Sequence, residues 1–212
     1  MGPSKVITFR SILPALVFIV ALNLSYLVLK GPTQNAILAY GYLWNAMFLA
    51  FPLAHVIARR ASLRELGYRG HDPLRLYARG AAVGAVWRFF DMLTGHYGVF
   101  TFLGAAQFLT GLLLALTLAP LFEDTFFRAY LQVGLEERLG AAGAIVVQAL
   151  LFATHPGHAA QGWAHFPAIF LFGLIAGLIY WRTRSIVPLF GAHGVANALP
   201  SIVASVARWW GT

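Results

Sequence analysis

Charged side chains are too scarce along this chain to cover a water-facing surface. Of its 212 residues, 59% are hydrophobic and only 10% are charged, whereas a soluble domain carries about 25% charged residues. Lipid is therefore the expected solvent, and the expected fold class is an all-α, polytopic transmembrane helix bundle. At about 20 residues per span, the length allows about seven helices, within a range of six to eight, in one integral membrane domain.

Apolar stretches long enough to cross a bilayer recur with little sequence between them. The expected spans are Ile12–Leu29, Ala36–Ile57, Tyr77–Leu93, Phe100–Leu131, Ala141–Thr154, Phe166–Trp181 and Val187–Val206. One markedly polar stretch, Arg59–Arg79, follows the second span, and we expect a short amphipathic helix within it at the headgroup level. We divide the chain into N-terminal transmembrane helices at 1–99, with a basic cytoplasmic loop at 59–79, and a helical core at 100–212 that carries the candidate site.

Basic residues gather in alternate loops between the spans. They occur near Lys5 and Arg10, in the loop at 59–79, and around Arg128–Arg138 and Arg182–Arg184. This asymmetry predicts a multi-pass protein of the cell membrane with a cytoplasmic N-terminus. The net charge of +8 is then explained by anionic membrane lipid, and we expect no nucleic-acid partner. The absence of cysteine excludes thiolate nucleophiles and Cys-ligated metal sites.

Two adjacent acids, Glu123 and Asp124, lie within an apolar helical stretch. A charged group at the centre of a bilayer costs about 2.5–3.5 kcal/mol even on the mildest scales. Arg128 follows Asp124 by four residues, on the same helix face, and is the expected ion-pair partner. Glu123 is not explained by that pair and is the first candidate for a functional residue.

Histidines in two other apolar runs complete the candidate site. His155 ends the fifth run, and His193 lies within the seventh, where Asn197 follows one turn later on the same helix face. Helical rise places Glu123, His155 and His193 inside a hydrocarbon layer about 30 Å thick. We therefore expect these three side chains to meet around one cavity.

A carboxylate near two imidazoles permits two hydrolytic chemistries. In the first, Glu123 is a general base that activates water, while His193 and Asn197 stabilise the oxyanion. In the second, His155, His193 and a carboxylate bind a divalent metal that activates the water. The helical zinc motif HExxH does not occur in the chain. We favour the metal-free chemistry, and hence no cofactor.

At these residues the chain resembles the CPBP family of intramembrane proteases, which includes type II CAAX prenyl proteases, bacteriocin-processing enzymes and abortive-infection proteins. The family motif EExxxR corresponds to EDTFFR at Glu123–Arg128, and FxxxH corresponds to LFATH, which ends at His155. The third motif, HxxxN, corresponds to HGVAN at His193–Asn197. The resemblance covers about Phe100 to Leu199.

The resemblance implies an intramembrane endopeptidase of the glutamic type. It implies that Glu123 activates the water, that His155 assists, and that the oxyanion and supporting residues are His193, Asn197, Asp124 and Arg128. The substrate would be a membrane-associated peptide or protein cut near its membrane anchor. A prenylated CAAX-type tail, a leader peptide and a C-terminal sorting signal are all compatible with the family.

The chain departs from the family motifs at two positions. Asp124 stands where the family has a second glutamate, and Leu151, not phenylalanine, lies four residues before His155. The second departure leaves His155 and His158 as alternatives for the functional imidazole. We favour His155, and expect His158 and His165 in a polar loop.

A different class of function is also compatible with the intramembrane acids. A small proton-coupled transporter could use Glu123 and Asp124 as a proton site, and a membrane interaction or immunity protein needs no catalysis. The pair His193 and Asn197 favours the hydrolase, because an oxyanion site needs such donors and a proton relay does not.

Overall fold

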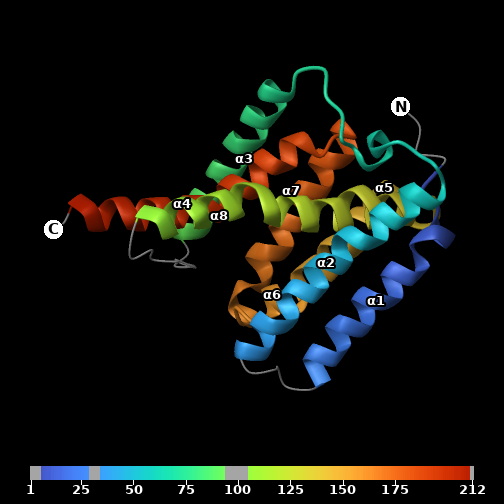
Figure 1. Ribbon diagram of the computed structural model, residues 1–212, viewed down its shortest axis with the longest axis horizontal. Coiled ribbons are helices and arrows are strands. Elements are labelled where there is room, and N and C mark those ends of the chain that lie inside the picture. Colours follow the sequence, from blue (N-terminus) through green and yellow to red (C-terminus); the bar gives the residue numbers. More distant parts are fainter. Residues whose placement is uncertain (1–5, 29–33, 94–104, 211–212) are drawn as a thin grey trace. The chain divides into compact units, whose positions relative to one another are not determined.

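The computed structural model describes residues 6–28, 34–93 and 105–210. Over these ranges the chain is built of helices without any β-strand, which confirms the all-α class (Figure 1). Four helical stretches in the described ranges are long and apolar enough to cross a membrane. They are Phe9–Val28, Ala106–Thr154, Trp163–Thr183 and Val187–Arg208.

The fourth and fifth expected spans form one helical stretch of 49 residues. It contains α4 (Ala105–Ala119), the π-helical segment η2 (Pro120–Gln132) and α5 (Val133–Thr154). Pro120 has no N–H to donate to the preceding turn, and the wider helix begins at this residue. A break within α5 falls at Gly140, where φ is 66°, a conformation that glycine adopts readily.

In the polar stretch 59–79, the expected separate amphipathic helix is reduced to one turn, the 3₁₀ segment η1 (Leu63–Leu66), which the Ser62 side chain caps. Residues 73–79 already belong to the helix that follows. Gly67 ends η1 in the left-handed region, with φ 77°. The next helix, α3 (Pro73–Leu93), begins at a proline, which suits the first turn of a helix but not its interior.

The described residues form two compact units, each assembled from two separate segments of the chain. The first unit contains residues 1–68 and 122–184, and the second contains 69–121 and 185–212. The domain boundary expected at 99/100 lies within 94–104, outside the described residues.

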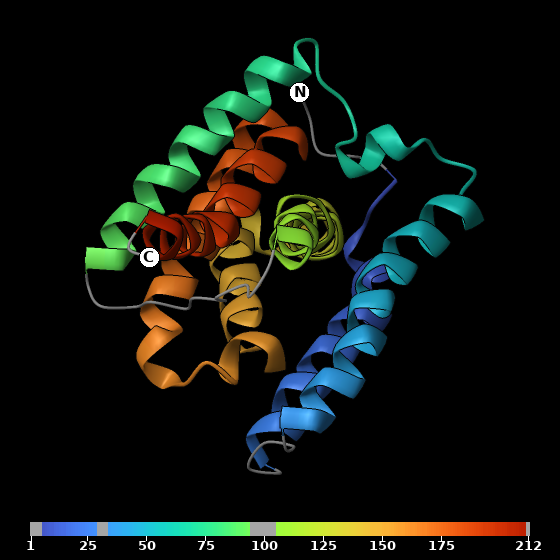
Figure 2. The ribbon, with the colours of Figure 1, turned by 60° about the vertical axis from the view of Figure 1, so that its left-hand side comes forward.

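In the first unit, α1 (Phe9–Val28) and α7 (Phe166–Thr183) pack against α5. The helix α2 (Gln34–Ala58) runs beside α1 in both views (Figures 1 and 2), where the rings of Phe18 and Phe51 lie 5.4 Å apart. The side chain of Asn23 on α1 donates to the carbonyl of Leu151 at 3.1 Å and to Oγ1 of Thr154 at 2.8 Å. These bonds fix the last turn of α5, directly before His155.

Small residues and amides join α7 to the helices around it. The amide of Gln148 donates to the carbonyl of Gly173 at 2.8 Å, and that of Gln132 donates to the carbonyl of Gly177 at 3.0 Å. Side-chain amides of this kind bind helices together where both are surrounded by lipid.

In the second unit, α3 packs against α8 (Val187–Trp210) through backbone contact (Figure 2). A Cβ atom at Gly80 would lie 1.8 Å from the carbonyl oxygen of Pro188, and one at Gly84 would lie 2.1 Å from that of Ala192. The charges of Arg88 and Asp91, which interrupt the third apolar run, form an ion pair within α3.

Candidate active site

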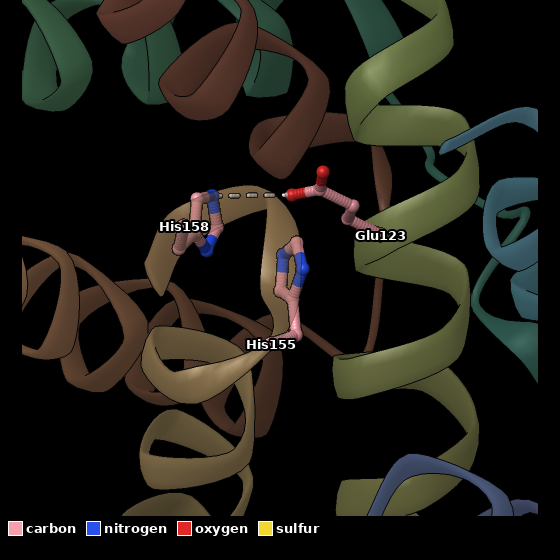
Figure 3. Close-up of side chains that lie close together, drawn as sticks. All are labelled: Glu123, His155 and His158. Carbon is pink, nitrogen blue, oxygen red and sulfur yellow. Dashed lines mark ion pairs between the residues drawn. The ribbon is translucent and has the colours of Figure 1, made fainter. Parts of the chain in front are cut away.

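Three side chains of the first unit converge on one point: Glu123, His155 and His158 (Figure 3). Glu123 projects from the π-helical segment η2, and the two histidines come from the junction of α5 with the short helix α6 (Pro156–Ala159). One ligand atom from each residue lies within 4.8 Å of the others. The side chains of Glu123 and His158 are 13% and 15% exposed, so neither is fully enclosed by the protein.

The local sequence His-Pro-Gly-His builds this junction. His155 ends α5 in an extended conformation, with ψ 153°, and is the N-cap of α6. Pro156 occupies the first turn of α6, where its missing N–H is not needed. Gly157 allows the close approach of the His155 ring, because a Cβ atom there would lie 2.8 Å from Cε1 of the imidazole.

His158 lies in α6 and faces Glu123. The sequence predicts a polar loop at this position, and that prediction is wrong. The Nε2 atom of His158 is 3.9 Å from Oε2 of Glu123, and its ring centroid is 4.2 Å from that of His155. The sequence signal that was missed is the proline at 156, which starts a new helical turn and brings the residue three positions after His155 back to the site.

Hydrogen bonds to the backbone give the two imidazoles opposite tautomers. The backbone N–H of Gly157 donates to Nδ1 of His155 at 3.1 Å, so the neutral ring carries its proton on Nε2. A carbonyl can only accept, so Nδ1–H of His158 donates to the carbonyl of Phe152 at 2.8 Å, and its neutral ring has the lone pair on Nε2. When both rings are neutral, the site therefore offers a donor from His155 and an acceptor from His158.

Aromatic rings hold His155 in place on several sides. Phe127 stacks on its imidazole with ring centroids 5.8 Å apart, and Phe48 and Phe152 lie edge-on at 5.8 and 5.9 Å. His155 itself is 2% exposed. A ring enclosed in this way keeps one orientation, which fixes the direction of its Nε2–H group.

The expected ion pair of Asp124 with Arg128 is present. Nη1 of Arg128 lies 3.1 Å from Oδ1 of Asp124, and both side chains are 0% exposed. The guanidinium also stands over the ring of Phe152, 3.9 Å from its centroid, a favourable cation–π position. The pair, formed within η2, neutralises the buried charges beside Glu123, and the contact of Arg128 with Phe152 joins η2 to α5.

A hydrogen bond from the loop before α3 supports the same helix. The hydroxyl of Tyr68 and Oγ1 of Thr125 lie 2.7 Å apart. Burial raises the pKa of Tyr68 above its ordinary value, although the hydrogen bond with Thr125 opposes this shift. The hydroxyl therefore stays protonated at neutral pH.

The three converging side chains also form a possible metal-ligand set, because two histidines and a glutamate are common ligands of zinc. His158 suits that role, since it presents the Nε2 lone pair while Nδ1–H is held by a carbonyl. His155 does not, because its Nδ1 accepts from Gly157 and its Nε2 holds the proton. Ligation by His155 would break the N-cap bond of α6, and this favours the metal-free chemistry.

His193 and Asn197 lie on α8, in the second unit. His193 is buried, with 3% of its surface exposed, whereas Asn197 is exposed. A Cβ atom at Gly194, the next residue after His193, would lie 3.0 Å from Cα of Leu116 on α4. The oxyanion role of His193 and Asn197 remains a prediction.

Residues 104–199 match a family model, described as type II CAAX prenyl endopeptidase Rce1-like. The matched range contains all three motifs read from the sequence, and the match confirms that resemblance. No curated protein and no solved structure matches the chain. Together with the four apolar helices of the described ranges, the match identifies an integral membrane protein.

Removing one charge of the buried pair should destabilise the protein strongly. We expect Arg128→Met to lower the free energy of unfolding by about 3–5 kcal/mol, because Asp124 would remain buried without its cation. The double variant Asp124→Leu/Arg128→Met should recover most of that loss. Denaturant unfolding in detergent measures both effects.

The matched control is Arg182→Met, which removes an exposed arginine at the end of α7 and should change stability little. If the single and double variants at the pair were equally unstable, the cost would come from lost packing and not from an isolated charge.

Proposed function

We propose that this chain hydrolyses a peptide bond within the membrane by water that Glu123 activates. The match of residues 104–199 to the Rce1-like family of type II CAAX prenyl endopeptidases supports this proposal. The family supports a protease of the CAAX type. The observation that carries the glutamate mechanism is the position of Glu123, a partly exposed carboxylate beside two imidazoles of opposite tautomer.

The chemistry begins with a water molecule beside the Glu123 carboxylate. Glu123 takes one proton as the water oxygen attacks the carbonyl carbon of the substrate, the usual work of a general base. His155 presents Nε2–H to the same site and orients the water or the carbonyl. His193 and Asn197, the third motif, would donate to the oxyanion that forms on the carbonyl oxygen.

We propose a membrane-associated peptide or protein as the substrate, cut close to its lipid or transmembrane anchor. A prenylated CAAX-type tail agrees best with the matched family of type II CAAX prenyl endopeptidases. A leader peptide or a C-terminal sorting signal offers the same chemistry, a flexible peptide held at the membrane surface. A farnesylated CAAX peptide in liposomes is therefore the first substrate to test.

Glu123→Gln should abolish cleavage of that peptide. The amide keeps the shape of the side chain but cannot take a proton from water, so we expect kcat to fall by about 10²–10⁴-fold. The measurement is release of the tripeptide by the purified protein in liposomes, in the presence of a strong chelator and without it. The wild-type rate should not change with the chelator.

Cleavage by Glu123→Gln at the wild-type rate would exclude the protease mechanism and leave a transporter or interaction protein as the better hypothesis. Loss of wild-type activity in the chelator, restored by added metal, would instead show a metal enzyme.

His155→Asn should separate the structural role of His155 from its catalytic role. Asparagine is a strong N-cap residue and can accept from the N–H of Gly157, but it has no group at the position of Nε2. We expect kcat to fall by about 10²-fold or more, with a melting temperature close to that of wild type. His155→Ala should lose the cap as well, at about 1 kcal/mol, and a fully active His155→Asn would refute the role of Nε2–H.

We also propose that the N-terminus and the basic loop at 59–79 lie on the cytoplasmic side, because basic residues favour that side. The chain has no cysteine, so Arg64→Cys, on the exposed part of η1, would carry the only thiol. A membrane-impermeant maleimide should label it in inside-out vesicles and not in intact cells. Labelling in intact cells alone would reverse the orientation.

A further inference from the structure

We propose that His158 is the general acid that protonates the leaving amine, acting as a pair with Glu123. This inference rests on the proposed hydrolysis by Glu123 and adds a second proton-transfer group to it. The motifs read from the sequence assign His155 and His193 to the site, and His158 lies outside all three.

The first observation is that two acceptor atoms face each other. Nδ1–H of His158 is held by the carbonyl of Phe152 at 2.8 Å, so the neutral ring directs a lone pair from Nε2 toward Oε2 of Glu123, 3.9 Å away (Figure 3). A carboxylate and an imidazole lone pair repel each other unless one proton lies between them. At 3.9 Å the two atoms are too far apart for a direct hydrogen bond, but a proton on Nε2 of His158 turns their repulsion into an attraction while Glu123 acts as the ionised base.

The second observation is that the same proton cannot come from His155. Its Nδ1 accepts a hydrogen bond from the N–H of Gly157 at 3.1 Å. Protonation of the His155 ring would place a proton on this same Nδ1 and break the hydrogen bond. His158 has no such restriction, because its Nδ1 is already a donor in both charge states. Of the two histidines, His158 is thus the one whose surroundings permit a protonated ring.

The third observation is the packing that holds His158 in this position. Phe152 contacts its imidazole edge-on, with ring centroids 4.3 Å apart, and the same phenyl ring lies under the Arg128 guanidinium. His158 is 15% exposed on its side chain, so a substrate nitrogen can approach Nε2.

The proton balance closes over one turnover. Glu123 takes a proton from water, and the remaining hydroxide oxygen bonds to the carbonyl carbon. The C–N bond then breaks as Nε2–H of His158 gives its proton to the departing nitrogen, which leaves as an amine. The proton on Glu123 passes to Nε2 of His158 and restores the starting pair, so the net reaction consumes one water and yields one acid and one amine.

The test compares two leaving groups in one peptide. The probes are a farnesylated CAAX peptide and its analogue with a thioester at the scissile bond, because a thiolate leaves without being protonated. His158→Asn keeps a donor for the Phe152 carbonyl but lacks a group at Nε2. We expect it to cleave the amide about 10²-fold more slowly than wild type, and the thioester less than about 5-fold more slowly.

The controls separate this inference from the proposed function. His71→Asn removes an exposed histidine outside the site and should cleave both probes at the wild-type rate. Glu123→Gln should cleave neither probe. If His158→Asn is unstable, His158→Gln replaces it, because it places an amide near the position of Nε2. This variant should also cleave the amide more slowly while it cleaves the thioester at nearly the wild-type rate. Equal slowing of both probes, or no slowing of the amide, would overturn the role of His158, whereas wild-type cleavage by Glu123→Gln would overturn the mechanism of Glu123.

Discussion

The buried ion pair of Asp124 with Arg128 is the interaction on which the arrangement of the site depends. Both side chains are fully buried, where an isolated charge would be very unfavourable. Both residues lie on η2, and the guanidinium of Arg128 also stands over the face of Phe152 on α5, which joins the pair to that helix. A charged group that could not otherwise lie in an apolar helix thus fixes the helix that carries Glu123.

Phe152 transmits that constraint to the histidines. Its ring lies between Arg128 and His158, and its carbonyl accepts the Nδ1–H of His158. The same backbone leads three residues later to His155, which Phe127 and Phe48 enclose. Two polar rings are therefore oriented by apolar packing and by backbone groups, while the Glu123 side chain remains partly exposed.

The helices within each unit associate without help from the hydrophobic effect, because lipid is as apolar as their side chains. In the second unit the attraction comes from close backbone contact at Gly80 and Gly84. In the first unit, amide bonds from Gln132 and Gln148 to α7 supply it. These bonds have fixed geometry and give Glu123, His155 and His158 the rigid support that acid–base chemistry requires.

The sequence by itself determined the class of the protein, because charge scarcity and repeated apolar runs leave lipid as the solvent. Its three motifs predicted the resemblance that the family match of residues 104–199 confirms. It also determined the partner of Asp124, since spacing along a helix is local information. The tertiary structure alone decided that His158 joins His155 beside Glu123, because that depends on a helix restarting at Pro156. It also decided the two tautomers, which follow from the backbone groups of Gly157 and Phe152 that each ring meets after folding.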